Sequence, residues 1–507
     1  MRVGLLIVWM LGLSCMARAD ESQQMRPNVL FIAIDDLNDW ASPFGGHPQA
    51  ITPNLERFAK SGSVVFQNAS CAGPVCGPSR SALLSGFRPS TTGVYGNSNN
   101  MLCSPIVQQN ATLPEYFAKH GYQTISRGKI FHAHSTRQGR DQGQWAFQDW
   151  SPAGRGVGVD LSKLTSRDKN LINGRPGPES EFTKRSGSEF AWGPTRGGIA
   201  ETSDYKVAQW AAGQLQAEHD RPFFLAVGLF RPHLPFFAPQ EFFDLYDIDR
   251  IELPPINEGD LADIVTPAGR PKFTASADYL WLKQNDLLKQ AARAYLAMVS
   301  YADANLGVIF DALQESPHAG NTIVVVWGDH GWHLGEKLRY RKATGWGEAT
   351  RVPLIVKTPD MDQRSDCDAP VNLLDLYPTL VDYCGLPPKS LDGDSFVPLL
   401  NDPNATWRDA SVTIFGIGNA SVVGKDWRYV RHRDATEELY DLRGDPQEWV
   451  NLAGSSSAEA IAAKKHLDTF VPERFADEIP RNDPKWKQQA SASGQGIQVN
   501  RDLSQLR

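Results

Sequence analysis

Acidic, imidazole and amine side chains stand directly after four apolar runs of this sequence. Three of the runs are short and continuous, which is typical of strands buried on both faces of a parallel sheet. Because the carboxyl ends of parallel strands meet at one edge of a sheet, we expect the side chains that follow the runs to converge there. They are Asp35 and Asp36 after residues 28–34, Lys129 and His132 after the weaker run at 123–126, His233 after residues 223–229, and Asp329 with His330 after residues 322–327.

Three carboxylates in this group indicate a site for a metal ion. Asp35, Asp36 and Asp329 would repel one another if they met, and buried charge without a partner is costly. Oxygen ligands suit a hard divalent cation such as Ca²⁺ or Mg²⁺, and His330 adds a nitrogen. Zinc is less favoured, because the sequence shows no tight spacing of histidines and cysteines. A single aspartate after a strand is more often a helix cap, so the prediction depends on all three meeting.

The segment Cys76-Gly77-Pro78-Ser79-Arg80, which continues to Gly86, is the most specific pattern in the chain. Pro78 suits the first turn of a helix, and Gly86 suits its end. Cys76 would then lie at a helix N-terminus, where the partial positive charge favours an anion. The alternative is a structural cysteine that precedes a capped helix, which holds for most lone cysteines but does not account for this longer pattern.

The elements that must position these residues predict an α/β protein. Helix-like stretches alternate with the strand runs, which favours a large, mainly parallel sheet flanked by helices on both faces. These stretches span residues 52–61, 113–120, 202–219 and 282–316.

Two parts of the chain depart from that alternation. From about Ala133 to Ala200 the sequence is rich in Gly, Arg and Ser, which predicts a long loop-rich insertion. Past about Asn401, short alternating runs predict a smaller C-terminal α+β subdomain. Its expected strands include residues 411–417 and 427–433, and its expected helix spans residues 457–469.

Length and composition set broad limits on the function. The 507 residues allow about three domains or one large α/β unit, and 41% hydrophobic residues allow a sizeable core. The formal net charge of −7 makes the chain a poor non-specific nucleic-acid binder. Any anionic ligand must therefore be attracted by a local basic pocket.

The N-terminus predicts an exported protein. Residues 1–19 combine Arg2, the mostly apolar run from Leu5 to Leu13 and the small-residue site Ala17-Arg18-Ala19, as in a cleaved signal peptide. The run is too short to span a bilayer, and no later stretch approaches a membrane span. We therefore expect a secreted or periplasmic protein.

Export also bears on the five cysteines that follow the signal peptide. In an oxidising compartment an odd count leaves one thiol over, and Cys76 is the expected one. The simplest bridges for the others are Cys71–Cys103 and Cys367–Cys384, although the sequence does not fix the connectivity.

From about Asn28 to Leu452 the chain resembles the type I sulfatases. In that family, Cys-x-Pro-Ser-Arg followed by Leu-x-Gly-like residues is the signal for converting the cysteine to formylglycine. The chain is most similar to the iduronate-2-sulfatase-like branch, which has Asp-His where many sulfatases have Asp-Asn. The features that carry this likeness are Asp35-Asp36-Leu37, Gly128-Lys129-Ile130-Phe131-His132, Arg231-Pro232-His233-Leu234-Pro235, Gly328-Asp329-His330-Gly331-Trp332, Leu334-Gly335-Glu336, Glu438-Leu439-Tyr440-Asp441-Leu442 and Asp445-Pro446.

The resemblance implies a fold, an activity and partners. The fold would be alkaline-phosphatase-like, with a catalytic domain at residues 26–402 and a C-terminal subdomain at residues 403–507. The activity would be hydrolysis of sulfate esters on carbohydrates, either uronate 2-sulfates or other sugars from glycosaminoglycans or algal polysaccharides. A formylglycine-generating enzyme would be the maturation partner, and neither nucleic acid nor a membrane span is expected.

The resemblance also implies a role for each site residue. One calcium ion would be held by Asp35, Asp36, Asp329, His330 and the aldehyde-hydrate oxygen of modified Cys76. Arg80 would steady the hydrate and the metal carboxylates. Lys129 and Lys342 would contact sulfate oxygens, His132 would deprotonate the spare hydroxyl of the hydrate, and His233 would protonate the departing sugar oxygen. The choice of Lys342 depends on an ungapped residue count from Asp329-His330 to Val352-Pro353-Leu354. Arg339 and Arg341 are close by and are alternatives for the same role.

Two other functions stay open at this point. A phosphohydrolase of the same superfamily would use the same metal edge on phosphate esters, and the intact Cys76 motif argues against it. A catalytically silent sugar-binding relative would lack the nucleophile or a metal ligand, and this chain lacks neither.

Overall fold

The centre of the molecule is an eight-stranded sheet. The computed structural model describes residues 26–132, 146–151, 160–167, 171–172, 175–176 and 190–479. The strand order is β16-β2-β15-β12-β1-β10-β4-β5, and of these eight strands only β15 runs against the others. The strands are β1 (Asn28–Ile34), β2 (Val64–Phe66), β4 (Gln123–Gly128), β5 (Asp149–Ser151), β10 (Phe223–Leu229), β12 (Thr322–Gly328), β15 (Leu354–Lys357) and β16 (Ser365–Cys367). The predicted mainly parallel sheet is confirmed.

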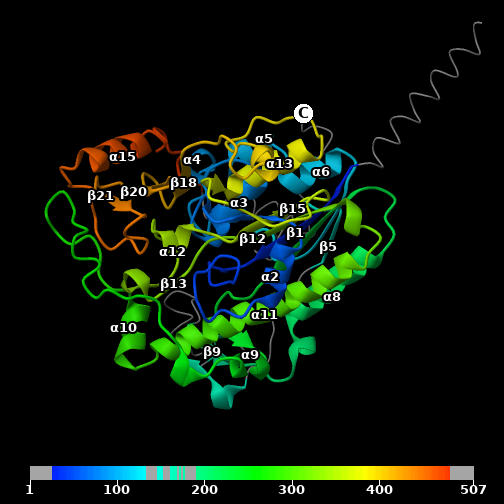
Figure 1. The fold of residues 1–507 in the computed structure, drawn as a ribbon, viewed down its shortest axis with the longest axis horizontal. Helices are drawn as coiled ribbons and strands as arrows, with labels where there is room; N and C mark the ends of the chain where they lie inside the picture. Colours follow the sequence, from blue (N-terminus) through cyan, green and yellow to red (C-terminus); the bar gives the residue numbers. More distant parts are fainter. Residues whose placement is uncertain are drawn as a thin grey trace, which may run out of the picture.

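Helices cover both faces of this sheet, as Figure 1 shows. Side chains alternate along β1, so that Leu30 and Ile32 enter one core while Val29 and Phe31 enter the other, and all four are fully buried. Burying each large apolar side chain contributes about 1.5–3 kcal/mol, so both helical layers are held firmly against the sheet. One layer contains α2 (Pro53–Lys60), α8 (Ser203–Gln216) and α11 (Leu288–Gln314), and the other contains α3 (Cys76–Ser85), α6 (Leu113–Lys119) and α13 (Leu376–Tyr383).

The long helix expected at residues 282–316 is two helices. The first, α10 (Ala277–Gln284), ends before Asn285, and α11 begins at Leu288. Asp286 lies between them with a φ of 55°, a left-handed conformation that interrupts the helical hydrogen bonds. By length and composition α11 could cross a membrane, but most of it is buried inside the fold. Its apolar face packs against the sheet as part of the core.

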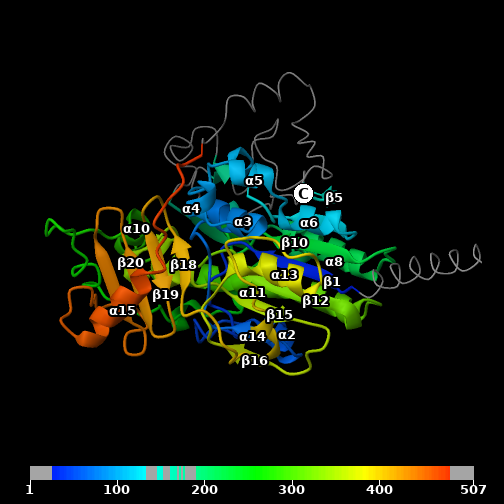
Figure 2. The same cartoon turned by 90° about the horizontal axis from the view of Figure 1, so that it is seen from above.

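A second sheet lies at one end of the molecule (Figure 2). Its four antiparallel strands are β18 (Ser411–Ile414), β19 (Ala420–Val423), β20 (Trp427–Arg431) and β21 (Glu437–Asp441), and α15 (Ala458–Asp468) packs on them. The sheet approaches the larger unit closely at Gly345, where an added Cβ would lie 2.8 Å from the Phe415 ring. This is the expected smaller α+β unit.

Shorter elements connect these layers. They include β9 (Ala191–Pro194) and β11 (Phe236–Ala238), which pair in a small sheet with β6 (Thr165–Ser166), and the two-stranded pair β13 (His333–Leu334) and β14 (Tyr340–Arg341). The remaining described helices and 3-10 turns are α4 (Pro89–Thr92), α5 (Pro105–Gln109), α9 (Gln240–Asp244), α12 (Gly347–Thr350), α14 (Val397–Asn401), η1 (Met101–Cys103), η2 (Leu161–Lys163), η3 (Ile199–Glu201), η4 (Ile248–Arg250), η5 (Ala319–Asn321), η6 (Glu336–Leu338) and η7 (Leu373–Asp375). The remaining strands are β3 (Ala69–Ser70), β7 (Leu171–Ile172), β8 (Arg175–Pro176) and β17 (Val371–Asn372).

Some predictions fall outside the described residues. The predicted signal peptide at residues 1–19 is one, and most of the insertion expected between Ala133 and Ala200 is another.

The prediction of two disulfides is wrong. Cys71, Cys367 and Cys384 are buried free thiols, so neither the Cys71–Cys103 bridge nor the Cys367–Cys384 bridge forms. The Cys71 thiol instead faces the carbonyl of Ala349 at 3.8 Å, within a core of apolar side chains. A buried free cysteine of this kind behaves as a small apolar residue.

The end of β4 offers a test of how tightly the central strands pack. Gly128 has a φ of 90°, and an added Cβ would lie 2.0 Å from the carbonyl oxygen of Gly228 on β10. We expect G128A to lower the free energy of unfolding by about 2 kcal/mol or more, because backbone must move to admit the methyl group. Urea denaturation measures this change.

The matched control is G213A, on the exposed side of helix α8, where nothing lies within 4 Å of the added methyl group. Alanine favours a helix by up to about 1 kcal/mol over glycine, so G213A should stabilise the protein. A G128A variant as stable as the parent would contradict the tight approach of β4 and β10.

Candidate active site

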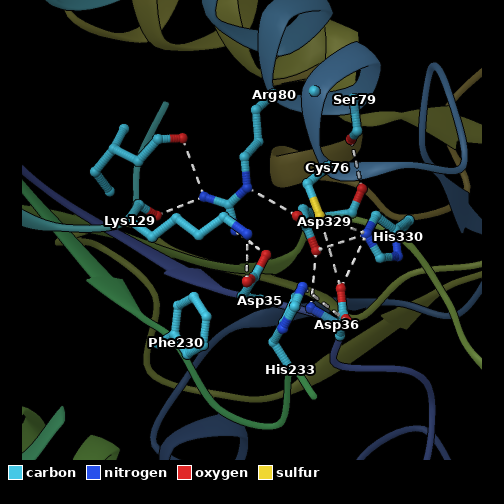
Figure 3. A network of polar contacts seen from close by, with 12 residues as sticks. Asp35, Asp36, Cys76, Ser79, Arg80, Lys129, Phe230, His233, Asp329 and His330 are labelled. Carbon is cyan, nitrogen blue, oxygen red and sulfur yellow. Dashed lines mark hydrogen bonds and ion pairs between the residues drawn. The ribbon is translucent and has the colours of Figure 1, made fainter. Parts of the chain in front are cut away.

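The polar side chains that follow the central strands meet at the carboxyl edge of the sheet, as Figure 3 shows. The strands β12, β1, β10 and β4 are neighbours in that order. Asp35 and Asp36 therefore lie beside Asp329, and the backbone N–H of Asp36 donates to Oδ1 of Asp329 at 3.0 Å. All three carboxylates are fully buried.

Cys76 joins this cluster from the N-terminus of α3. The helix begins at Cys76, has Pro78 in its first turn and ends before Gly86, which is left-handed with a φ of 80°. Every residue of the helix is buried. The Sγ atom of Cys76 lies 3.3 Å from Nε2 of His330 and 3.8 Å from Oδ1 of Asp36. The helix predicted from the motif thus places its first residue next to the carboxylates.

Arg80, one turn further along α3, connects the strand ends from the protein interior. Its Nε donates to Oδ2 of Asp329 at 2.7 Å, and its Nη2 donates to Oδ1 of Asp35 at 3.1 Å. Its Nη1 donates to the carbonyl oxygens of Lys129 and Ile130. The guanidinium group is fully buried, so these bonds are made away from water and hold helix and strands in one arrangement.

Two lysines also contact the carboxylates. Lys129, directly after β4, forms an ion pair with Asp35, and the Lys342 Nζ lies 2.5 Å from Oδ1 of Asp36. The same Nζ atom lies 3.2 Å from Sγ of Cys76. The residue count that selected Lys342 therefore led to a residue of the cluster.

The two residues that competed with Lys342 point elsewhere. Arg341 forms an ion pair with Asp278 at 2.5 Å. The guanidinium group of Arg339 lies over the rings of Phe273 and Trp346, at 5.1 and 5.5 Å from their centroids.

The positive side chains make this edge favourable for negative charge. Burial raises the pKa of Asp35, but the charges of Lys129, His233 and Arg80 together outweigh it and hold that pKa below its usual range. Burial likewise raises the pKa of Cys76, and Lys129 and Lys342 together hold it well below the value of an ordinary thiol. Burial raises the pKa of Asp329 to about 6 in spite of Arg80. An anion at position 76 is therefore stabilised by its surroundings.

Two histidines flank position 76. The Nδ1 atom of His233 lies 2.5 Å from the carbonyl oxygen of Leu234, and its Nε2 lies 3.8 Å from Oδ2 of Asp36. Because a carbonyl oxygen can only accept, Nδ1 carries the hydrogen and Nε2 faces the cluster. A hydrogen bond from His132 helps to lower the pKa of Cys76, while burial lowers the pKa of His132 itself.

The residues present fit a bound cation. Ligand atoms of Asp36, Cys76, Asp329 and His330 all lie within 4.8 Å of one another, and an overlapping group adds Asp35. The Oδ2 atom of Asp36 is buried and has no hydrogen-bond partner among the described residues. Leaving such an atom unsatisfied costs about 1–3 kcal/mol, which a cation would recover. A donor set of mainly carboxylate oxygens suits a hard divalent ion.

Three contacts that support the site were not predicted. The Tyr295 hydroxyl group on α11 donates to the carbonyl oxygen of Asp36 at 2.7 Å, and the Ser79 hydroxyl group donates to the carbonyl oxygen of Asp329. Asn97 accepts the N–H of Gly77 at 2.7 Å through its side chain, in the first turn of α3. Tyr295 and Asn97 are ordinary polar residues of a helix and a loop, and no sequence pattern distinguishes them.

Comparisons with known proteins agree with this geometry. The sequence model of the family described as "Sulfatase" matches residues 27–386, and that of "N-sulphoglucosamine sulphohydrolase, C-terminal" matches residues 328–470. A protein named "Sulfatase" from Formosa agariphila is 36% identical over 470 residues, covering 89% of each chain. The iduronate 2-sulfatase of Homo sapiens is 29% identical over 497 residues, covering 89% of this chain and 83% of that one.

A solved structure shows the same fold. It is the structure of BT4656 in complex with its substrate D-glucosamine-2-N,6-O-disulfate, with a TM-score of 0.64 and 21% sequence identity. The similarity covers 88% of this chain and 96% of that chain.

Removing the Arg80 guanidinium group should destabilise the protein strongly. In R80M, Asp329 and Asp35 lose buried ion-pair partners, and breaking such a pair typically costs about 3–5 kcal/mol. Urea denaturation in the presence of a chelator measures the loss without help from a bound cation.

The control is R57M, which breaks the ion pair between Arg57 and Asp311, whose side chains are 49% and 57% exposed. An exposed pair is worth less than about 1 kcal/mol. If R80M lost no more stability than R57M, Arg80 would not hold the site together.

Proposed function

The chain belongs to the sulfatase family, and we propose that it hydrolyses sulfate esters of carbohydrates with a formylglycine made from Cys76 and one calcium ion. That it is a sulfuric ester hydrolase follows from the family. The observation that carries the rest of the proposal is the position of Cys76. The first residue of a Cys-x-Pro-Ser-Arg helix lies among three carboxylates, two lysines and three histidines at the carboxyl edge of the sheet.

Carbohydrate substrates are supported by the relatives. Two of the similar proteins are iduronate 2-sulfatases, and another is named ulvan-active sulfatase. A uronate 2-sulfate or another sugar released from a sulfated polysaccharide is the proposed substrate.

The residues that would hold the calcium ion are Asp35, Asp36, Asp329, His330 and the oxygen of residue 76. A bound cation supplies positive charge that lowers the pKa of a hydroxyl group and neutralises the ester. A hydrated formylglycine supplies one hydroxyl group as nucleophile and a second that allows the sulfate to be released again. The Nδ1 atom of His330 lies 2.9 Å from the carbonyl oxygen of Gly331, which directs Nε2 toward the other ligands.

The chain's own cations bind the sulfate group. The ammonium groups of Lys129 and Lys342 lie against the carboxylates of Asp35 and Asp36, where they can contact sulfate oxygens. Arg80 keeps its contacts with Asp35 and Asp329 and so fixes the ligands in place. Fixed charges of this kind need no rearrangement when negative charge develops on the ester.

The two histidines move protons. His233 presents Nε2 to the site and gives a proton to the sugar oxygen as the alcohol leaves. His132 lies beside residue 76 and takes a proton there, and its Nδ1 has no hydrogen-bond partner among the described residues.

Maturation can be tested on a single tryptic peptide. Residues 61–80 contain both Cys71 and Cys76, so the peptide carries its own control. When the protein is made with a formylglycine-generating enzyme, residue 76 should lose sulfur and two hydrogens and gain one oxygen, while Cys71 still reacts with an alkylating agent. Mass spectrometry distinguishes the two outcomes, and conversion at Cys71 or at neither position would contradict the proposal.

Activity should follow that conversion. We expect C76A to lower sulfate ester turnover by about 10⁴-fold or more, because the nucleophile is lost, and C71A to retain most of it. The same preparation assayed on a phosphate monoester should be slower than on the matching sulfate ester. Faster phosphate cleavage would favour the phosphohydrolase, and binding of sulfated sugar without turnover would favour the silent relative.

Calcium binding can be measured without any assay of turnover. At a free Ca²⁺ concentration of 100 times Kd, the folded protein should gain about 2.7 kcal/mol, so its Tm should rise and a chelator should reverse the rise. D36N, which removes a ligand from the centre of the cluster, should abolish this shift. D311N, which changes an exposed carboxylate, should keep it. A Tm that responds to Mg²⁺ but not to Ca²⁺ would show that the ion is wrongly assigned.

A further inference from the structure

The turn that carries His233 is held by a buried carboxylate from another part of the chain. The turn joins β10 to β11 and begins with Phe230 and Arg231. Asp204, the second residue of helix α8, accepts the N–H of Phe230 through both carboxylate oxygens at 3.1 Å. It also accepts the N–H of Arg231 at 2.9 Å. Asp204 is only 1% exposed, so these bonds form without competition from water.

The same turn is closed on its other side by Arg231. The Nη1 atom of Arg231 donates to the carbonyl oxygen of His233 at 2.6 Å, and its guanidinium group lies 5.1 Å from the centroid of the Phe230 ring. The N–H of His233 donates to the carbonyl oxygen of Phe230 at 3.1 Å. The backbone at His233 is thus fixed relative to the two N–H groups that Asp204 holds.

Fixing the backbone also fixes the imidazole ring. The ring is bound to its own turn through Nδ1 and the carbonyl oxygen of Leu234, so its Nε2 direction follows the turn. In Figure 3, His233 and Phe230 lie on the same ribbon beneath the carboxylates, and the His233 ring points toward Asp36. A displacement of about 1 Å at a reacting group can cost about 100-fold in rate.

We propose that Asp204 is a positioning residue for His233, acting through the backbone of the turn and not through contact with substrate. The inference rests on the proposed function, in which His233 is the general acid. Asp204 belongs to α8, in one of the helical layers that cover the sheet. In the sequence it cannot be distinguished from other acidic residues that occupy the first turn of a helix. In D204N only one oxygen can still accept, and the amide NH2 would face an N–H group, so the turn is held less firmly and can move away from the cluster.

The rate acceleration by a general acid depends on the leaving group. As the bond between sulfur and the ester oxygen breaks, the electron pair stays on that oxygen and the proton from Nε2 of His233 is transferred to it. A poor leaving group such as an alkoxide or an electron-rich phenoxide needs this proton. A nitrophenoxide leaves readily as an anion, so its loss depends little on the acid.

The experiment compares D204N with the parent on 4-nitrophenyl, phenyl and 4-methoxyphenyl sulfate, with fully converted residue 76. We expect kcat/KM to fall by about 10- to 100-fold on 4-methoxyphenyl sulfate but by less than about 3-fold on 4-nitrophenyl sulfate. The loss should lie in kcat, with KM nearly unchanged, because sulfate binding by the lysines is untouched.

The matched control is D303N. Asp303 is also buried, at 2% exposure, and it accepts the backbone N–H groups of Asn54 and Leu55 at 3.0 and 2.8 Å. Those groups begin helix α2 and lie outside the site described here. D303N should therefore lose comparable stability while its rates on the three esters keep the ratio of the parent.

A double-mutant cycle completes the test. If Asp204 acts through His233, adding D204N to H233A should cost no more than about 2-fold further on 4-methoxyphenyl sulfate. Equal losses of D204N on all three esters, or full additivity with H233A, would overturn the positioning role while leaving the sulfatase proposal intact. If the parent enzyme cleaves neither these three esters nor any sulfated sugar, the proposed function is overturned. This inference is then overturned with it.

Discussion

Three carboxylates share one buried sheet edge in this protein, and the rest of the site exists to compensate their charge. Asp35, Asp36 and Asp329 are fully buried. Charges without an opposite charge nearby are very unfavourable in such a position. Arg80 from helix α3 and the two lysines Lys129 and Lys342 supply the opposite charge. The Oδ2 atom of Asp36 has no hydrogen-bond partner among the described residues, and the proposed cation would add its charge there.

Such compensation works only if the groups cannot move apart, and the core provides that rigidity. Four adjacent strands end at the site, and β1 is packed on both faces by separate apolar cores. Helix α3 is buried over its whole length, so residue 76 and Arg80 are placed by packing and not by a mobile loop. Preorganised charge of this kind is effective in catalysis because little of it must reorient during the reaction.

Two of the three histidines of the site, His233 and His330, are positioned in a different way, through backbone groups. His233 and His330 each direct Nε2 inward because Nδ1 is bound to the carbonyl oxygen of the following residue. The orientation of His233 follows its turn, and Asp204 on helix α8 accepts the first two N–H groups of that turn. The groups proposed to bind sulfate and to transfer protons are thus held by separate parts of the fold.

Much of this protein could be predicted from its sequence, since the signals were local. Continuous apolar runs predicted β1, β10 and β12, and Pro78 with Gly86 predicted α3, because burial on two faces and helix ends each require particular residues nearby. Parallel strands also implied that Asp35 and Asp329 would meet. The absent disulfides, the ion pairs of Lys129 and Lys342 and the support from Tyr295 and Asp204 were decided by the tertiary structure alone. Each depends on the distance between segments far apart in the chain, and that distance is set by how whole layers pack.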